Sequence, residues 1–303
     1  MRVKVLGSAA GGGFPQWNCK CRNCAGVRAG TLRARPRSQS SIAVSGDGEH
    51  WALFNASPDI LAQIGATPEL QPRHALRSSG IAAVVLTDGQ VDHVTGLLLL
   101  REGKRLPLYT TALVRDDLMH GFPVLPLLDH FCGVDWHCIA VDARWFTILG
   151  IEGIDLQAIP LVSKPAPFSP RRDAPQPGDN IGVVIRDRQS RRSMFYAPGI
   201  AAIDDRIGEA MASADCLLVD GTFWTDEEML TLGVGRKRAR EIGHLPQAGA
   251  GGMIECLREF PNARRVLIHI NNTNPILDEA SAERGTLERE GIEVAFDGME
   301  FVL

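Results

Sequence analysis

A crowded polar loop behind a buried strand constrains this chain more than any other feature. Residues 81–86 form an apolar run typical of a buried strand, and residues 94–100 form a second run typical of a helix. The loop between them, residues 87–93, reads Thr-Asp-Gly-Gln-Val-Asp-His. Because side chains in such a loop can converge on one ion, the pattern predicts a metal site at the end of this strand.

Two later strands also end in residues that bind metals. Asp220 closes the apolar run that begins at Cys216, and His269 closes the run that begins at Val266. Functional residues of α/β sheets gather at the carboxyl ends of strands. Burying these groups without partners would cost several kcal/mol, a cost that a shared ion removes. We therefore predict that Asp92, His93, Asp220 and His269 meet at one metal centre.

Two other polar features are open to two interpretations each. His244 follows a basic segment, and either a general acid or base near the metal or a structural role suits it. An asparagine of the turn 271–274 either supplies a ligand or second-layer hydrogen bond, or caps the turn. His50, His74, His120, His130 and His137 lie away from predicted strand ends, and we expect no functional role for them.

Strand and helix patterns alternate along the chain without a linker or a repeat, which predicts a single α/β domain over residues 1–303. Strands are predicted at 3–6, 41–44, 51–55, 81–87, 106–110, 154–159, 181–186, 193–197, 216–220 and 265–269. Helices are predicted at 59–66, 94–101, 112–119, 202–211, 251–260 and 281–291. Five prolines in residues 163–178 exclude a helix there. This loop is either an active-site lid or a surface connection.

Net charge and the N-terminal sequence indicate which classes of binding partner and which cellular compartment to expect. The net charge of −4 gives no reason to expect nucleic-acid or membrane partners. The cluster Arg236, Lys237, Arg238 and Arg240 favours a solvated face, with an anion contact as the alternative. Residues 1–7 indicate a strand rather than a signal peptide, and no apolar run approaches the ~18 residues that span a bilayer. We expect a cytoplasmic protein with reduced cysteines.

Cys19, Cys21 and Cys24 are the strongest local metal signal. Three thiols within six residues suit a tetrahedral Zn site that needs one more ligand, whereas three free thiols there would be prone to oxidation. The other four cysteines, at 132, 138, 216 and 256, stand in apolar surroundings and are predicted to be core residues. The glycine-rich segment 7–13 lacks the phosphate-loop pattern, and we expect its backbone to pass close under the metal site.

Long segments of the chain resemble a family of pyrroloquinoline quinone (PQQ) biosynthesis proteins within the metallo-β-lactamase superfamily. The segments that carry this resemblance are 7–24, 55–59, 88–97, 178–180, 195–199, 214–222, 269–279 and 294–299. The resemblance implies the metallo-β-lactamase fold, a four-layer αββα sandwich. The superfamily motif is His-x-His-x-Asp-His, and here Asp88 and Gln90 replace its two leading histidines.

These replacements imply that one of the superfamily's two metal sites is lost. No histidine occurs at 159–163, where that site takes its third ligand. The other site maps to Asp92, His93 and His269, with Asp220 at the bridging place. Superfamily relatives with a similar three-cysteine zinc complete it with a histidine three residues after the last motif histidine. Asn272 holds that position here, so the fourth ligand is Asn272, water or another group.

The retained ligand set, two imidazoles and a carboxylate, suits non-haem Fe(II) or another divalent metal. The resemblance then implies an O2-dependent hydroxylase acting on the tyrosine ring of a Glu-Tyr crosslinked, peptide-derived intermediate of PQQ biosynthesis. His244 or Asp220 would move protons, arginines near the pocket would hold substrate carboxylates, and other pathway proteins are possible partners. Two alternatives remain: a zinc-dependent hydrolase, and a non-catalytic protein that carries or transports PQQ.

Overall fold

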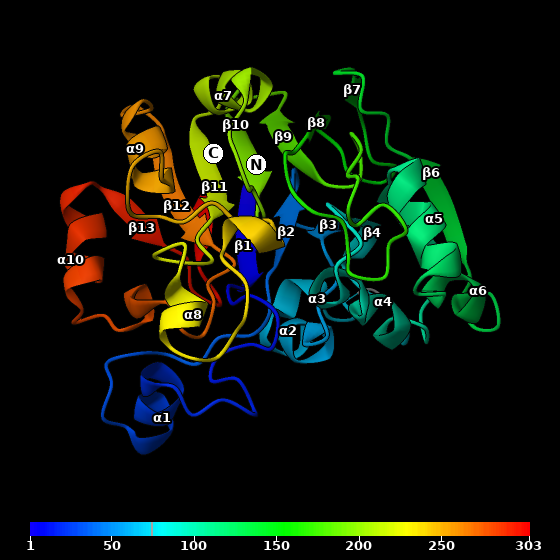
Figure 1. The fold of residues 1–303 in the computed structure, drawn as a ribbon. Coiled ribbons are helices and arrows are strands. Elements are labelled where there is room, and N and C mark those ends of the chain that lie inside the picture. Colours follow the sequence, from blue (N-terminus) through cyan, green and yellow to red (C-terminus); the bar gives the residue numbers. More distant parts are fainter. Residues whose placement is uncertain (74) are drawn as a thin grey trace.

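Two mixed β-sheets packed face to face form the centre of the protein, as a computed structural model of residues 1–73 and 75–303 shows (Figure 1). His74, for which the sequence predicts no role, lies outside the described residues. Helices cover the outer face of each sheet. This is the four-layer αββα sandwich that the sequence predicts.

Seven strands form the first sheet, one half of which is antiparallel and the other half parallel. In spatial order they are β14 (Glu300–Val302), β1 (Arg2–Gly7), β2 (Ser41–Ser45), β3 (Trp51–Phe54), β4 (Ile81–Val85), β5 (Leu106–Thr110) and β6 (Val134–Cys138). Strands β3 to β6 form the parallel half, and β4 leads into the polar loop at 87–93.

The second sheet has the same mixed organisation. Its strands, in spatial order, are β13 (Ile292–Val294), β12 (Arg264–Ile268), β11 (Cys216–Asp220), β10 (Ser193–Ala197), β9 (Ile181–Asp187), β8 (Ile154–Pro160) and β7 (Trp145–Phe146). Strands β10 to β13 are parallel, so Asp220 at the end of β11 and His269 just after β12 leave the same edge of the sheet.

The helices divide between the two outer faces. The first sheet is covered by α2 (Ile60–Ala66), α4 (Gly96–Leu99), α5 (Ala112–His120) and α6 (Val124–Leu128). The second is covered by α7 (Asp205–Ala212), α9 (Met253–Arg258) and α10 (Ala282–Arg289). The other helical segments are α1 (Arg22–Ala29), α3 (Val91–Val94), α8 (Glu228–Thr231), η1 (Pro68–Leu70), η2 (Arg240–Ile242) and η3 (Pro275–Leu277). No described helix is long and apolar enough to cross a membrane.

Alternating burial explains why the central strands are apolar throughout. In β11, Cys216 and Leu218 pack into the core between the sheets, whereas Leu217 and Val219 pack under the helices of the outer face. Both faces of the strand are therefore buried, as is typical of parallel strands covered on both sides. Phe54 and Tyr196, from different sheets, meet edge to face with their ring centres 6.0 Å apart.

Most predicted elements are present, and the differences have local causes. The helix predicted at 94–101 begins earlier and is broken into α3 and α4, because the amide of Gly96 donates to the carbonyl of Ala56 (2.9 Å) outside the helix. Helices α1 and α6 and several edge strands were not predicted. Of the cysteines predicted in the core, Cys216 is buried, but Cys138 is exposed on the edge strand β6.

The proline-rich segment 163–178 is an irregular loop, as predicted, and charged residues anchor it to the first sheet's helical layer. Arg171 contacts the carboxylates of Asp117 (2.9 Å) and Asp179 (2.7 Å), and Ser169 donates to Asp117 (3.0 Å). Both carboxylates are almost wholly buried. The loop also contributes Ser163 and Arg172 to the wall of the main cavity. It is therefore part of the site and is held against the rest of the protein.

The anchor predicts that Arg171→Ala strongly destabilises the fold. Removing the guanidinium leaves two buried carboxylates without their cation, a loss worth about 3–5 kcal/mol in comparable buried pairs. Urea unfolding should show this decrease in the free energy of unfolding. Arg188→Ala, at an exposed arginine that also pairs with an aspartate, should change stability little. Equal midpoints for the two variants would contradict the anchor.

Candidate functional site

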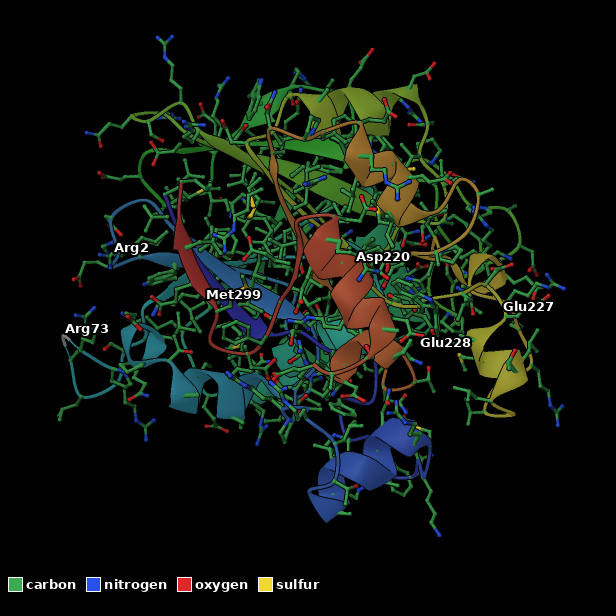
Figure 2. All side chains as sticks on the ribbon, turned by 90° about the vertical axis from the view of Figure 1, so that its left-hand side faces the viewer. Arg2, Arg73, Asp220, Glu227, Glu228 and Met299 are labelled. Atoms are coloured by element: carbon green, nitrogen blue, oxygen red, sulfur yellow. The ribbon has the colours of Figure 1, made fainter. Side chains whose placement is uncertain are left out.

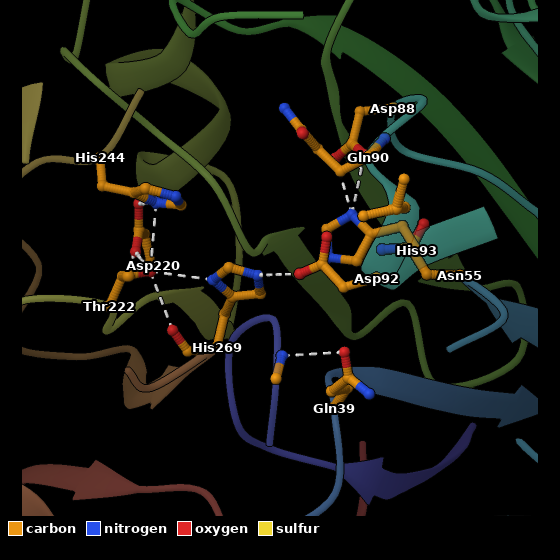
Figure 3. Close-up of polar contacts among 12 residues, drawn as sticks. Gln39, Asn55, Asp88, Gln90, Asp92, His93, Asp220, Thr222, His244 and His269 are labelled. Carbon is orange, nitrogen blue, oxygen red and sulfur yellow. Dashed lines mark hydrogen bonds and ion pairs between the residues drawn. The ribbon is translucent and has the colours of Figure 1, made fainter. Parts of the chain in front are cut away.

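Loops at one edge of the sandwich bring the predicted residues together around a cavity of about 250 Å³. Asp92 and His93 come from α3, which follows β4, and His269 comes directly after β12. The Asp92 Oδ2 and His269 Nε2 atoms are 3.2 Å apart, which joins the two sheets at the site (Figure 3). The ligand atoms of Asp92, His93 and His269 all lie within 4.8 Å of one another, a spacing that can hold a metal ion.

His93 is oriented by the residue that replaces a motif histidine. Its Nδ1 atom lies 2.8 and 2.9 Å from the two carboxylate oxygens of Asp88. An imidazole bonded to a carboxylate through Nδ1 carries its proton there and leaves Nε2 as an electron-pair donor. The Nε2 atom is buried and has no hydrogen-bond partner among the described residues. An unpartnered buried nitrogen at this place fits a metal ligand.

The charges around the triad favour a cation. Burial alone would raise the pKa of Asp92, but the charge of His93 and the hydrogen bond from His269 hold it well below its usual range. Burial lowers the pKa of His93, yet Asp88 and Asp92 together raise it to about 9. Two carboxylates thus hold positive charge at His93, and a metal ion can supply that charge in place of the proton.

Asp220, predicted at the bridging place, has hydrogen-bond partners of its own. Its oxygens accept hydrogen bonds from the amides of Ile200 (2.9 Å) and Thr222 (2.9 Å) and from the Thr222 hydroxyl (2.6 Å), and one lies 2.8 Å from His244 Nδ1. This carboxylate is fully buried and already has four donors. Asp220, His244 and His269 also form a group spaced closely enough for a metal. The saturated carboxylate suits an orienting role better than a bridging one.

His244 lies beside the triad with one nitrogen left for the cavity. Its ring stacks on that of His269 with centres 5.3 Å apart, and its Nδ1 atom is held by Asp220 (Figure 3). Burial lowers the pKa of His244, but the charge and hydrogen bond of Asp220, together with the charge of Asp92, outweigh burial and raise it. The geometry therefore suits proton transfer at Nε2 and favours that interpretation over a purely structural role.

Sequence reasoning gave no role to Thr222, which connects these side chains. Its hydroxyl donates to Asp220 and lies 2.9 Å from His269 Nδ1 and 3.1 Å from His244 Nδ1. A hydroxyl two residues after a strand-end aspartate was the available signal. His269 itself has a left-handed backbone (φ 61°), a strained conformation that positions the ring at the strand end.

The glycine-rich segment passes under the site as predicted. A Cβ atom added at Gly11 would lie 3.2 Å from Asp92 Oδ2, and one at Gly7 would lie 2.0 Å from the carbonyl of Gln39. The amide of Gly12 donates to the Gln39 side chain (3.0 Å; Figure 3). Only residues without a side chain allow this approach.

The three predicted thiols form a second group that can hold a metal. Cys19, Cys21 and Cys24 lie within 4.8 Å of one another, on a segment that projects from the sandwich with α1 (Figure 1). The Asn272 amide nitrogen lies 3.1–3.6 Å from all three sulfurs. Because amide nitrogen and oxygen positions are interchangeable by a half-turn, the oxygen can face the sulfurs instead. Asn272 as fourth ligand stays a prediction.

Behind this thiol group, a buried carboxylate links α8 to the turn after β12. Glu228 accepts from the amide of Trp224 (2.7 Å) and contacts the Thr273 hydroxyl (2.5 Å). Figure 2 shows it further inward than Glu227, which lies at the margin of the molecule. Burial raises the pKa of Glu228 to about 7.

Ionisation of Glu228 should therefore reduce the free energy of unfolding as the pH rises from 4.5 to 7. In this window the folded state keeps a proton that the unfolded chain releases, so the free energy of unfolding falls as pH rises. Glu228→Gln has no carboxyl group to ionise at this position. At pH 8 we expect its free energy of unfolding to exceed that of the wild type by about 3 kcal/mol, and this difference should shrink toward zero at pH 4.5. Thermal or urea unfolding at both pH values measures it. Glu227→Gln serves as the exposed control, and a pH-independent gap would contradict the assignment.

Comparisons with known proteins identify relatives of this chain. A family model of the beta-lactamase superfamily domain matches residues 50–270. Coenzyme PQQ synthesis protein B from Azoarcus sp. is 57% identical over 301 residues, and that from Cupriavidus necator 58% over 302 residues; each match covers 99% of both chains.

Solved structures give the same likeness at the level of the fold. The crystal structure of Zn2+-bound PqqB from Methylobacterium extorquens is similar with a TM-score of 0.92 and 40% identity, covering 100% of both chains. A diphosphatase from the PhnP family matches with a TM-score of 0.67 and 20% identity over 99% of this chain and 97% of the other, a likeness of fold alone.

Proposed function

Because this chain belongs to the coenzyme PQQ synthesis protein B family of the metallo-β-lactamase superfamily, we propose that it acts in PQQ biosynthesis as an iron-dependent oxygenase. Its substrate would be the Glu-Tyr crosslinked, peptide-derived intermediate, whose tyrosine ring it hydroxylates. The observation that carries the proposal is the unpartnered, buried Nε2 atom of His93, held beside Asp92 and His269.

Of the two metal sites of the superfamily motif, the chain keeps ligands for one. Asp92, His93 and His269 would hold Fe(II), which binds and activates O2 when its remaining positions are open. Asp88 and Gln90, at the places of the lost ligands, have other partners: Asp88 holds His93, and the Gln90 side chain donates to the carbonyl of Lys164 (3.2 Å). The two-metal clamp of many hydrolytic relatives therefore lacks its ligands here.

The cavity walls suit an aromatic substrate. Phe223, Met229 and Ile242 supply apolar surface, and His244 faces the same space. Hydroxylation replaces a ring C–H by C–OH with one atom of O2, and the other leaves as water with two electrons and two protons from a reductant. His244, held by Asp220, would take the ring or phenol proton at Nε2.

The second group would be a structural zinc site. Cys19, Cys21 and Cys24 would bind Zn2+ and fasten the segment that carries α1, with Asn272 as the fourth ligand. The relative from Methylobacterium extorquens was crystallised with Zn2+, which agrees with a zinc-binding family.

Oxygen uptake tests the proposal. Protein reconstituted anaerobically with Fe(II) should consume O2 only when the Glu-Tyr crosslinked substrate and ascorbate are present, and the product should gain the mass of oxygen. His93→Ala should abolish uptake, whereas the exposed His120→Ala should not. Substrate-dependent hydrolysis with Zn2+, and none of the oxygen chemistry, would instead establish the hydrolase. Tight PQQ binding with neither activity would establish the carrier.

The carboxylate behind His93 makes a separate prediction for metal affinity. Asp88→Asn keeps the shape but removes the charge that orients the imidazole, and such changes reduce metal affinity about 10–100-fold. Titration of the metal-free protein with Fe(II) or Zn2+ should show this loss in one class of site, with the three-cysteine site unchanged. Asp47→Asn, in the surface pair of Asp47 with His50 (2.7 Å), is the matched control. Undiminished affinity in Asp88→Asn would argue against His93 as a ligand.

A further inference from the structure

The guanidinium of Arg172 lines the main cavity. Of the described residues around it, Arg172 is the only arginine or lysine. It belongs to the proline-rich loop 163–178, far in sequence from the metal-binding residues. The cavity therefore has three chemically distinct surfaces: the imidazole and carboxylate groups, an apolar wall, and one guanidinium.

The adjacent arginines of this loop have opposite surroundings. Arg171 is neutralised by Asp117 and Asp179. Arg172 has no carboxylate within ion-pair distance in the described part of the chain, and its guanidinium makes one hydrogen bond, to the carbonyl of Pro165. The Arg171 anchor fixes the loop, and so Arg172 is presented to the cavity from a held backbone rather than from a free surface segment.

No ion pair within the described part of the chain offsets the partial burial of the Arg172 guanidinium. Burial lowers the pKa of Arg172, and the nearby charge of Asp173 only partly opposes this effect. A cation withdrawn from water gains most from an anion that enters with its own hydrogen-bond acceptors. Arginine offers a planar set of donors that matches a carboxylate with two parallel hydrogen bonds, and most of these donors are unused here.

The conspicuous basic cluster of the sequence does not supply this contact. Arg236, Lys237, Arg238 and Arg240 are absent from the described cavity lining. Arg238 pairs with Glu227 (2.8 Å), and Arg240 donates to backbone carbonyls. The cluster is therefore a solvated surface, which is the interpretation that the sequence favours. Arg172 remains as the candidate anion contact of the cavity.

We propose that Arg172 forms a carboxylate subsite that binds an acidic group of an aromatic substrate and so orients the ring toward the metal-binding triad. The identity of that substrate rests on the proposed function, whereas the subsite rests on the cavity lining and the unpaired guanidinium. The subsite makes the enzyme selective for acidic aromatic compounds over their neutral analogues.

Binding of PQQ, a tricarboxylate, and of its neutral trimethyl ester tests the subsite without turnover. Titration calorimetry with metal-loaded protein should show Arg172→Gln weakening PQQ binding about 10–100-fold, as expected for loss of a charge-assisted pair, and leaving ester binding unchanged. Arg172→Lys should fall between, because it keeps the charge but loses the paired geometry. Arg236→Gln, in the exposed cluster, should bind PQQ as wild type does.

Four results would contradict the subsite. Arg172→Gln could bind PQQ as tightly as the wild type does, or could lose affinity for PQQ and for the ester equally. Arg236→Gln could lose as much PQQ affinity as Arg172→Gln, or the wild type could fail to bind PQQ. Thermal unfolding checks that Arg172→Gln is folded, which we expect because the side chain makes only one hydrogen bond to the described residues.

Kinetics separate this proposal from the proposed function. If the hydroxylase is correct, Arg172→Gln should raise KM for the Glu-Tyr substrate more than it lowers kcat. Wild-type O2 uptake with an unchanged KM in Arg172→Gln refutes the subsite alone. Selective loss of PQQ binding, with no O2 uptake in any variant, refutes the oxygenase alone.

Discussion

The pairing of buried carboxylates with imidazoles is the constraint on which the site depends. Asp88 holds His93, and Asp220 holds His244, each at 2.8 Å and away from bulk water. A buried carboxylate without a partner is costly, so the ring that pairs with it is fixed in position and tautomer. His269 lies between the two pairs, with Asp92 beside one nitrogen and Thr222 beside the other. The αββα frame serves to bring these pairs to one edge.

Much of this arrangement could be predicted because it follows from strand pattern alone. Apolar runs identified β4, β11 and β12, and the rule that parallel strands present functional residues at their carboxyl ends placed Asp92, Asp220 and His269 together. The spacing of three thiols within six residues likewise predicted that their sulfur atoms lie close together. These signals are local in sequence, and each needs only the identity of a residue and its position on a strand.

What could not be predicted depends on contacts between distant segments. The role of Arg172 depends on Arg171 being neutralised by Asp117 and Asp179 while its neighbour is not, and no spacing in the sequence distinguishes two adjacent arginines. The break between α3 and α4 depends on Gly96 meeting Ala56. The four donors around Asp220 come from three separate loops, and no pattern in the sequence indicates that these loops meet.

The residues that replace the motif histidines have structural partners of their own. Asp88 stands where a metal-binding histidine is expected, yet it supports His93, and Gln90 ties the motif loop to the proline-rich loop at Lys164. Restoring histidines at both positions would therefore remove two supports and still leave no donor at residues 159–163. A second metal would need changes both in the motif loop and in the segment 159–163. Both supporting residues also line the main cavity, so the positions of the replaced motif histidines form part of its wall.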